Sequence, residues 1–456
     1  MIRHEDIGRA VREAEYAVRG PIVARAQELE RQGRKIIYCN IGNPQSLGQR
    51  PITWVRQVLA LAEYPELLER APAGLFPADV LEAARKVLAG SQHGLGAYTE
   101  SKGYRFVREA VAGFIRARDG IASDPEAIFL TDGASKAVQS VLRLLIDDAR
   151  DGVMIPIPQY PLYSATVTLY GGTQVPYHLL ENAEWRLSRD VLERALAGAK
   201  AKGIRTRAIC VINPGNPTGS VLDEQNVDMV LDFARTHGLS VLADEVYQAN
   251  VWLSGARFVS FASALEKRGH RDVSLFSFHS VSKGFLGECG HRGGYLECRN
   301  VPRDVMDEIT KLQSISLCAN SVGQIATYLL VHPPRPGDPS HALYEKERRE
   351  VLEVLRKKSE IVERGLNSVP GIHCNRIAGA MYAFPRITLP PGVTDDDYCL
   401  ALLEETGICV APGSGFGQDP GTMHLRTTIL PPMDEIEAVV SRLAAFHVAF
   451  TKRHGR

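Results

Sequence analysis

The chain has 456 residues, of which 45% are hydrophobic, 23% are charged and 40 are glycine. This composition is typical of a globular protein and gives no sign of a fibrous repeat or a disordered chain, and the length predicts two domains. The 53 basic and 53 acidic residues cancel without forming a long block of one sign, which argues against nucleic acid or an anionic membrane as a partner.

The 8 cysteines are scattered, mostly inside apolar runs, and none has a CxxC or CxxH spacing. We therefore predict no metal site and expect buried free thiols in a reducing compartment. No stretch approaches the roughly 20 apolar residues of a transmembrane helix, and the start "MIRHEDIGRA" lacks the apolar core of a secretory signal. A cytoplasmic protein is the expectation, with a transit peptide removed before residue 1 as the alternative.

The first 50 residues are predicted to form an N-terminal arm and part of a small domain. Charged and helically spaced apolar residues over 5–32 predict two short helices, interrupted at Gly20-Pro21. The segment 35–45, "KIIYCNIGNPQ", is an apolar run that ends in Gly-Asn-Pro, which is typical of a strand entering a turn.

Beyond Leu75 apolar strands alternate with helical segments, which predicts a mostly parallel sheet and an α/β fold. The strands are near-continuous apolar runs, as expected for a sheet covered by helices on both faces. We predict that residues 51–330 form this large domain, with the ligand site outside the carboxyl ends of the strands. The predicted strands and their ends include "AIFLT" (127–131), "GVMIPIP" (152–158), "AICVINP" (208–214), "SVLADEVY" (240–247) and "VSLFSFHSVSK" (273–283).

The segment 332–349, "HPPRPGDPSHALYEKERR", is rich in proline and glycine and then strongly helical. It predicts a domain boundary, with residues 331–456 forming a smaller domain. Three short apolar stretches separated by helical patterns favour an α+β arrangement for it, a small sheet backed by helices.

Four predicted strands end in polar residues. The strand 127–131 leads to Gly133, Ala134 and Ser135 at the start of a helical pattern, where free backbone N–H groups would bind an anion. Capping of that helix by the side chain of Asp132 or Ser135 explains the same residues equally well.

Asn216 and Asp244 follow the next two strand ends. Asn216 lies in "NPGNPTG", where two Asn-Pro steps and two glycines fix a rigid loop that would aim its amide into the cleft, although a purely structural turn explains most of the pattern. Asp244 comes directly after buried apolar residues, with Tyr247 three positions on. A carboxylate there needs a cation or several donors, and helix capping is the alternative.

Lys283 ends a further apolar strand, with Ser280 and Ser282 before it and Arg292 after it. A lone lysine at such a place is normally solvated. A lysine amine that is desolvated near other cations becomes a nucleophile toward carbonyls, and the neighbouring strand ends favour that interpretation.

Taken together, these residues fit one ligand, pyridoxal phosphate. Its aldehyde would bond to Lys283, its ring nitrogen would meet Asp244, and its phenolic oxygen would accept hydrogen bonds from Asn216 and Tyr247. Tyr160, in "PIPQYPLY", would stack on the ring, or else it is a core aromatic. The groups predicted to hold the phosphate are Gly133, Ala134, Ser135, Ser280, Ser282 and Arg292.

The motifs "NPGNPTG", "ADEVY", "SFHSVSKGFLGECGHRGG" and "HLRTTILP", in this order, resemble fold-type I pyridoxal phosphate aminotransferases, most closely the alanine aminotransferases. The resemblance covers almost the whole chain, and it implies the aspartate aminotransferase-like fold with a seven-stranded sheet. It also implies that Lys283 bonds to the cofactor and then shuttles a proton, and that Arg426 and the backbone at Gly42 hold the substrate α-carboxylate. Tyr98 matches a tyrosine that reaches the cofactor phosphate of a neighbouring subunit, so the resemblance implies a homodimer; an exposed loop tyrosine is the alternative.

The reaction that the resemblance implies is transfer of the amino group from L-alanine to 2-oxoglutarate, with amino acids and 2-oxo acids as small-molecule partners. Glyoxylate-using relatives share most of the motifs, and a related pyridoxal phosphate lyase would use the same residues around the cofactor. His291 departs from the polar or aromatic residues usual at its position. A regulator with a DNA-binding head is disfavoured by the short N-terminal region, and a dehydrogenase by the lack of GxGxxG.

Overall fold

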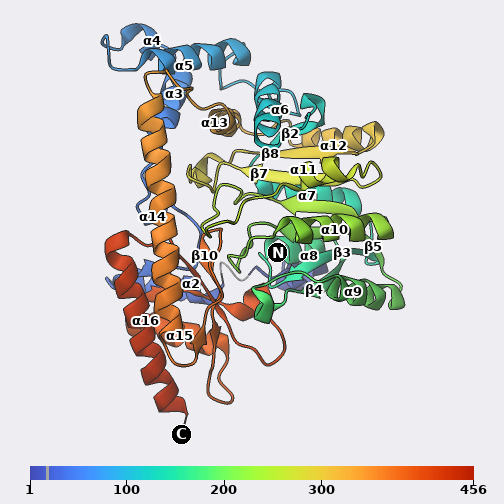
Figure 1. Cartoon of the computed structure of the whole chain (residues 1–456), viewed down its shortest axis with the longest axis vertical. Helices are drawn as coiled ribbons and strands as arrows, with labels where there is room; N and C mark the ends of the chain where they lie inside the picture. The colour runs from blue at the N-terminus through green and yellow to red at the C-terminus, as the bar shows by residue number, and fades with distance from the viewer. Residues whose placement is uncertain (17–19, 456) are drawn as a thin grey trace.

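The computed structural model describes residues 1–16 and 20–455 and is built around a seven-stranded sheet with the order β2-β8-β7-β6-β5-β3-β4 (Figure 1). All neighbouring strands are parallel except β8, which runs antiparallel to β2 and β7. The predicted mostly parallel α/β sheet is therefore confirmed. The strands are β2 (Ile128–Thr131), β3 (Asp151–Ile157), β4 (Thr173–His178), β5 (Arg205–Ile212), β6 (Ser240–Asp244), β7 (Leu275–Ser280) and β8 (Gly294–Arg299).

Helices cover both faces of this sheet, and alternate strand residues pack against opposite helix layers. In β5, Ile209 and Val211 pack with one layer, whereas Ala208 and Cys210 pack with the other. This period-two pattern explains why the strands are apolar throughout. One layer contains α9 (Arg189–Ala201), α10 (Glu224–His237) and α11 (Phe261–Arg268); the other contains α7 (Ala134–Leu145), α8 (Leu162–Leu169) and α12 (Arg303–Ile315).

A further helical layer packs against the β2 edge of the sheet, where Ile128 and Leu130 join its apolar core. This layer lies at the top of Figure 1. Its helices are α3 (Thr53–Glu63), α4 (Leu67–Arg70), α5 (Ala78–Ser91), α6 (Arg105–Asp119) and α13 (Ser321–Val331).

Residues 22–39 and the last third of the chain share a separate apolar core, which includes Ile22, Leu29, Leu355, Leu402 and Phe446. The α+β arrangement expected for this part is present, although the domain limits at residues 50 and 330 stay a prediction. Its strands are β1 (Ile37–Tyr38), β9 (Ile372–His373), β10 (Tyr382–Ala383), β11 (Arg386–Ile387), β12 (Ile408–Cys409), β13 (Ala411–Pro412) and β14 (Leu425–Thr428). Its helices are α2 (Pro21–Arg31), α14 (His341–Asn367), α15 (Asp395–Thr406) and α16 (Met433–His454).

A strand pair and a long helix connect the parts of the molecule. The early strand β1 lies parallel to β12, which fixes the chain that follows it near the sheet. The helix α14 runs along one side of the molecule from α3 to α16 (Figure 1). Both predicted helices of the arm are partly borne out by α1 (Arg9–Glu13) and α2, but residues 17–19 between them lie outside the described residues.

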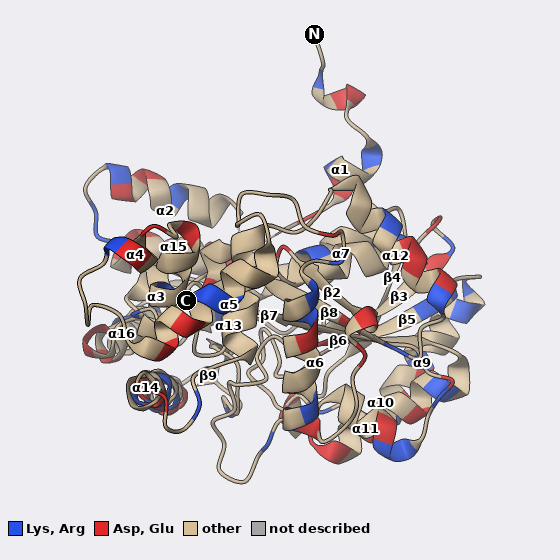
Figure 2. Ribbon diagram, turned by 90° about the horizontal axis from the view of Figure 1, so that it is seen from above, with Lys and Arg blue, Asp and Glu red and all other residues tan. Residues whose placement is uncertain are grey.

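The first residues of the chain extend away from the body (Figure 2). The helix α1 lies near α8. Figure 2 also shows acidic and basic residues interspersed over the outer helices, as the balanced composition predicts. All 8 cysteines are free, and six of them are buried. Across residues 1–16 and 20–455, no helix is both long and apolar enough to cross a membrane, and no cluster of potential metal ligands occurs.

Candidate active site

A cavity of about 460 Å³ opens at the carboxyl ends of the central strands. Its walls come from the sheet, the chain after β1 and the segment around β10 and β14, so the large sheet and the part with the separate apolar core both contribute to it. The sequence-predicted residues that line it are Gly42, Ala134, Ser135, Tyr160, Asn216, Asp244, Tyr247, Ser280, Ser282, Lys283, Arg292 and Arg426.

Lys283 follows β7 and points its amine at the chain after β1. Its Nζ donates to the Gly42 carbonyl at 2.5 Å and lies 5.9 Å from the ring centre of Tyr247. The approach depends on glycine, because a Cβ at position 42 would lie 1.9 Å from the Tyr382 hydroxyl oxygen. The N-terminal segment therefore closes over the lysine only because residue 42 has no side chain.

Asp244 ends β6 and is 5% exposed. Its Oδ2 accepts a hydrogen bond from the Tyr163 hydroxyl at 2.9 Å, and its Oδ1 accepts a longer one from the Val246 N–H at 3.4 Å. Burial raises the pKa of this carboxyl to about 6, against the hydrogen bonds and the charge of Lys283. Helix capping leaves this burial unexplained, whereas a cationic N–H partner would stabilise the carboxylate.

Asn216, Tyr247 and Tyr382 form a chain of hydrogen bonds beside Lys283. The Asn216 amide donates to the Tyr247 hydroxyl at 3.5 Å, and that hydroxyl donates to the Tyr382 hydroxyl at 3.1 Å. Burial opposes ionisation of Tyr382, but the nearby cations Lys283 and Arg426 outweigh it and lower its pKa. Hydroxyl and amide donors thus meet at one wall of the cavity.

Arg426 lies on β14 and is 1% exposed. Its Nη1 donates to Asn216 Oδ1 at 3.2 Å, its Nη2 donates to the Asn40 carbonyl, and its Cζ lies 4.5 Å from the ring centre of Tyr382. Its Nε is buried without a hydrogen-bond partner in the described part of the chain. A buried guanidinium that meets only neutral groups is arranged to bind an anion, and a carboxylate fits it in two contacts.

The N-terminus of α7 faces the cavity without a side-chain cap. Asp132 does not cap it, since its carboxylate accepts from the backbone and side chain of Asn320. Gly133 itself donates its N–H to the Thr131 carbonyl at 2.7 Å and adopts a φ of 75°. The free backbone donors are therefore those of Ala134 and Ser135, and we assign Gly133 the role of shaping the turn.

Arg292 completes this end of the cavity. Its guanidinium donates to the Asp132 and Cys289 carbonyls, both at 3.1 Å. A Cβ at Gly133 would lie 2.5 Å from its Nη2, so this glycine also makes room for the arginine. Ser280 and Ser282 lie alongside, with hydroxyl oxygens 2.9 Å apart.

The turn that carries Arg292 is held by the buried carboxylate of Glu288. Arg56 donates to it at 3.0 and 2.9 Å, and His291 Nδ1 lies 2.8 Å from its second oxygen. The ring of His291 therefore points to Glu288, and His291 is absent from the cavity lining.

The sequence of the whole chain matches known aminotransferases. A family profile described as "Aminotransferase class I and II" matches residues 67–443. The chain belongs to this family. A probable mitochondrial alanine aminotransferase from Dictyostelium discoideum is 47% identical over 99% of this chain and 89% of its own, and glutamate–glyoxylate aminotransferase 1 from Arabidopsis thaliana is 46% identical over 99% and 97%.

The fold of this aminotransferase is likewise that of solved relatives. An alanine aminotransferase from Pyrococcus furiosus superposes with a TM-score of 0.81 and 26% identity, covering 97% of this chain and 100% of the other. The aspartate aminotransferase-like fold expected from the motifs is confirmed by a Thermus thermophilus aspartate aminotransferase, with a TM-score of 0.76.

As a class I and II aminotransferase, the protein depends on pyridoxal phosphate, and its cavity fits that cofactor. The open N-terminus of α7 with Arg292 suits a phosphate, the buried carboxyl of Asp244 suits a protonated ring nitrogen, and Lys283 lines the same cavity. The Nε of Arg426, which has no partner among the described residues, suits a carboxylate. Each group thus matches one part of the cofactor or substrate.

Three tyrosines at the aminotransferase cavity were not predicted as site residues. Tyr382 and Tyr16 line it, and the Tyr163 hydroxyl donates a hydrogen bond to Asp244. The hydroxyls of Tyr16 and Tyr160 lie 2.6 Å apart, so the N-terminal arm contacts the cavity mouth. Tyr163 lies three residues after Tyr160 at the start of α8, a helical spacing that would have indicated it.

Tyr98 lies apart from this chain's own cavity. It is on the loop between α5 and α6, its side chain is 80% exposed, and it is absent from the lining residues. The residue predicted to serve a neighbouring subunit therefore points outward from this one.

Proposed function

We propose that this aminotransferase transfers the amino group of L-alanine to 2-oxoglutarate, giving pyruvate and L-glutamate in two half-reactions. The observation that carries the proposal is the 47% identity to an alanine aminotransferase over 99% of the chain. The cavity supports it, since about 460 Å³ with a buried arginine accommodates a small amino acid.

In this proposal each end of the site has one task. Pyridoxal phosphate, when bound, supplies the aldehyde that takes up the amino group and a ring that withdraws electrons. Arg426 orients the substrate through its carboxylate, which fixes the Cα–H bond relative to Lys283. Lys283 would hold the cofactor covalently and would move the proton at substrate Cα, and Asp244 would keep a proton at the ring nitrogen of the cofactor.

The remaining residues hold the cofactor in place. Asn216 and Tyr247 would donate to its phenolic oxygen, for which the Tyr247 hydroxyl would turn from Tyr382, the acceptor it has in this structure. Tyr160 stacks on the ring and is held by Tyr16. The phosphate is held by the backbone of Ala134 and Ser135 and by the side chains of Ser280, Ser282 and Arg292.

The first experiment follows the visible absorbance of the purified holoenzyme. L-Alanine is expected to bleach the band of the bound cofactor, and 2-oxoglutarate is expected to restore it. A band that glutamate bleaches and alanine does not would refute alanine as the donor. Without 2-oxoglutarate, release of only one pyruvate per bound cofactor and no ammonia is expected for transamination, because the amino group stays on the cofactor; a lyase reaction would turn over repeatedly without an acceptor and release ammonia.

Arg426→Leu is expected to raise the KM for L-alanine roughly 100-fold, because a buried charge-assisted contact to the substrate carboxylate contributes about 3 kcal/mol. Cofactor affinity should stay within a few-fold, since Arg426 lies at the substrate end of the cavity. Steady-state kinetics and cofactor titration check both values. Loss of cofactor binding instead would mean that Arg426 holds the cofactor.

Glyoxylate is a second candidate acceptor, and two observations favour it. A glutamate–glyoxylate aminotransferase is 46% identical over 99% of this chain. Among the described residues, the cations that line the cavity are Lys283, Arg292 and Arg426, so none of them remains for a distal carboxylate. Comparison of kcat/KM for 2-oxoglutarate and glyoxylate decides between the two acceptors.

We also propose that the enzyme is a homodimer in which Tyr98 reaches the phosphate of the other subunit. Its 80% exposure and its distance from this chain's own cavity lining support this role. A cytoplasmic location completes the proposal, while the relative from Dictyostelium discoideum is named mitochondrial. Sedimentation and cell fractionation test the two statements.

A further inference from the structure

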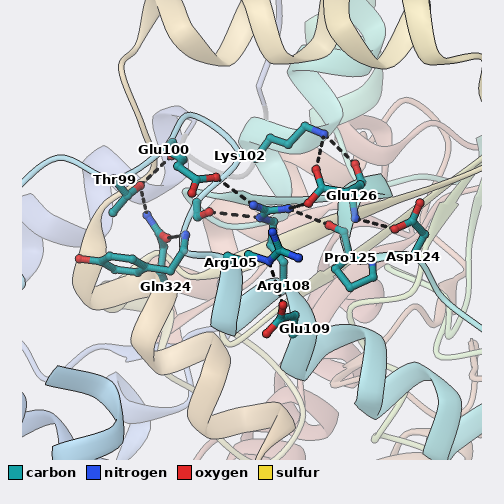
Figure 3. Close-up of polar contacts among 12 residues, drawn as sticks. Thr99, Glu100, Lys102, Arg105, Arg108, Glu109, Asp124, Pro125, Glu126 and Gln324 are labelled. Atoms are coloured by element: carbon teal, nitrogen blue, oxygen red, sulfur yellow. Dashed lines mark hydrogen bonds and ion pairs between the residues drawn. The ribbon is translucent and has the colours of Figure 1, made fainter. Parts of the chain in front are cut away.

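Arg108 on α6 is a charged side chain that is 2% exposed and is absent from the cavity lining. Its guanidinium is held from every side (Figure 3). Nε donates to the Gly103 carbonyl at 3.2 Å, Nη1 donates to the Pro125 carbonyl and to Glu126, both at 3.0 Å, and Nη2 donates to Glu100 at 2.9 Å. Two of these four partners belong to the loop that leads from Tyr98 into α6.

Packing of α6 alone gives no reason for this charge. The neighbouring core positions Val107, Val111 and Ile115 are apolar and fully buried, and an apolar residue at 108 would extend that face. Burying a guanidinium is costly unless its partners repay it. The carboxylate of Glu100 is 66% exposed, so the buried charge connects a solvent-facing loop residue to the interior.

A second buried side chain fixes the same loop. Gln324 accepts from the Tyr104 N–H at 2.8 Å and donates to the Thr99 hydroxyl at 3.1 Å (Figure 3). Gly103 has a φ of 88°, and a Cβ there would lie 2.6 Å from Leu130, so the loop backbone lies directly on the sheet. Residues 99–104 are thereby anchored at both ends.

The residue just before this anchored segment is Tyr98, whose side chain is 80% exposed. A side chain that only contacts solvent does not need a rigid backbone. A side chain that binds in another subunit's site does need a rigid backbone. We infer that Arg108 is a positioning residue for the neighbouring subunit's active site, because its guanidinium fixes the loop that presents Tyr98. The inference rests on the proposed sharing of sites.

Hybrid dimers test this directly. Chains with two different affinity tags allow a dimer of one Arg108→Met chain and one Lys283→Ala chain to be purified. One of its two sites combines Lys283 of the first chain with the intact Tyr98 loop of the second. We expect the Arg108→Met homodimer to lose at least tenfold in cofactor affinity and in kcat/KM, and the hybrid to recover close to half of the normal activity.

Controls separate this inference from the proposed function. A Tyr98→Phe chain paired with Lys283→Ala tests sharing itself. If that pair recovers and the Arg108→Met pair does not, the inference is overturned and sharing stands; if neither recovers, sharing fails and the inference with it. Arg105→Met is the matched arginine control, since Arg105 lies one turn earlier on α6, is 71% exposed and pairs only with Glu109 in Figure 3.

Hydrogen exchange of the cofactor-free protein tests the inference without a measurement of turnover. Arg108→Met is expected to speed hydrogen exchange of the amides of residues 99–104 while the amides of β5 and β6 stay protected. Glu100→Gln, whose exposed side chain leaves the core intact, should give a weaker effect in the same direction on exchange and on cofactor affinity. Normal exchange and normal affinity in both variants would overturn the inference.

Discussion

Lys283→Ala is expected to lower kcat by roughly 10⁴-fold, because it removes both the covalent anchor and the group that moves the proton. The amine lies 2.5 Å from the Gly42 carbonyl, inside a cavity that Gly42, Tyr247 and Tyr382 close around it. The holoenzyme spectrum should also change, since the cofactor is then bound only by non-covalent contacts.

The matched control for this substitution is Lys358→Met. Lys358 is also a buried lysine, 6% exposed, and burial lowers its pKa to about 8. It donates to the Leu430 carbonyl, however, and is absent from the cavity lining. We expect Lys358→Met to lower stability but to keep kcat. A Lys283→Ala enzyme that retained kcat within tenfold would contradict the assigned role.

The positions of Lys283, Asp244 and Asn216 could be predicted because each lies at, or within a few residues after, the carboxyl end of a strand of the sheet. The ends of parallel strands meet at one edge, so residues far apart in the chain are brought together by register alone. The strands β5 and β6 pair with Ile212 opposite Asp244, which places the Asn216 loop beside the carboxylate. Apolar periodicity was sufficient for this part of the site.

Tyr382 and Tyr16 could not be found in the same way. Tyr382 lies in a strand of only 2 residues, and its contact with Tyr247 joins segments 135 residues apart in the chain. Tyr16 reaches the cavity through the arm, whose direction depends on tertiary contacts with Tyr160. Local patterns carry no information on how separately packed segments meet.

The N-terminus of α7 shows what the sequence left open. Anion binding and capping by Asp132 or Ser135 were equally good explanations, and the structure removes capping, because Asp132 bonds to Asn320 on another helix segment. Only a tertiary contact could decide this. The same contact leaves the backbone donors of α7 facing the cavity.

Asp244→Asn is expected to lower kcat roughly 100- to 1,000-fold, because an amide cannot keep the ring nitrogen protonated and the charge-assisted hydrogen bond is lost. The Tyr163 hydroxyl, now 2.9 Å from the carboxylate, can still donate to the amide oxygen, so the fold should persist. Cofactor titration and pyruvate formation measure the two effects.

The same substitution is expected to stabilise the cofactor-free protein. Burial raises the pKa of Asp244 from 3.8 to about 6, so the folded state holds this proton more tightly than the unfolded state. The favourable contribution is complete below pH 3.8 and is lost as the pH rises through about 6. Above that pH the ionised carboxylate destabilises the folded state by about 3 kcal/mol, which the amide avoids.

Denaturant unfolding of the cofactor-free proteins checks whether Asp244→Asn raises the free energy of unfolding. The gain in free energy of unfolding from Asp244→Asn should be largest at pH 8 and smaller at pH 5, where the folded wild-type carboxyl is mostly protonated. With cofactor bound, the wild type should instead be more stable than Asp244→Asn, because the wild-type carboxylate then pairs with the protonated ring nitrogen and the amide does not. A variant less stable than the wild type at pH 8 without cofactor would contradict the assignment. The residue that drives turnover would thus be the one that destabilises the empty site.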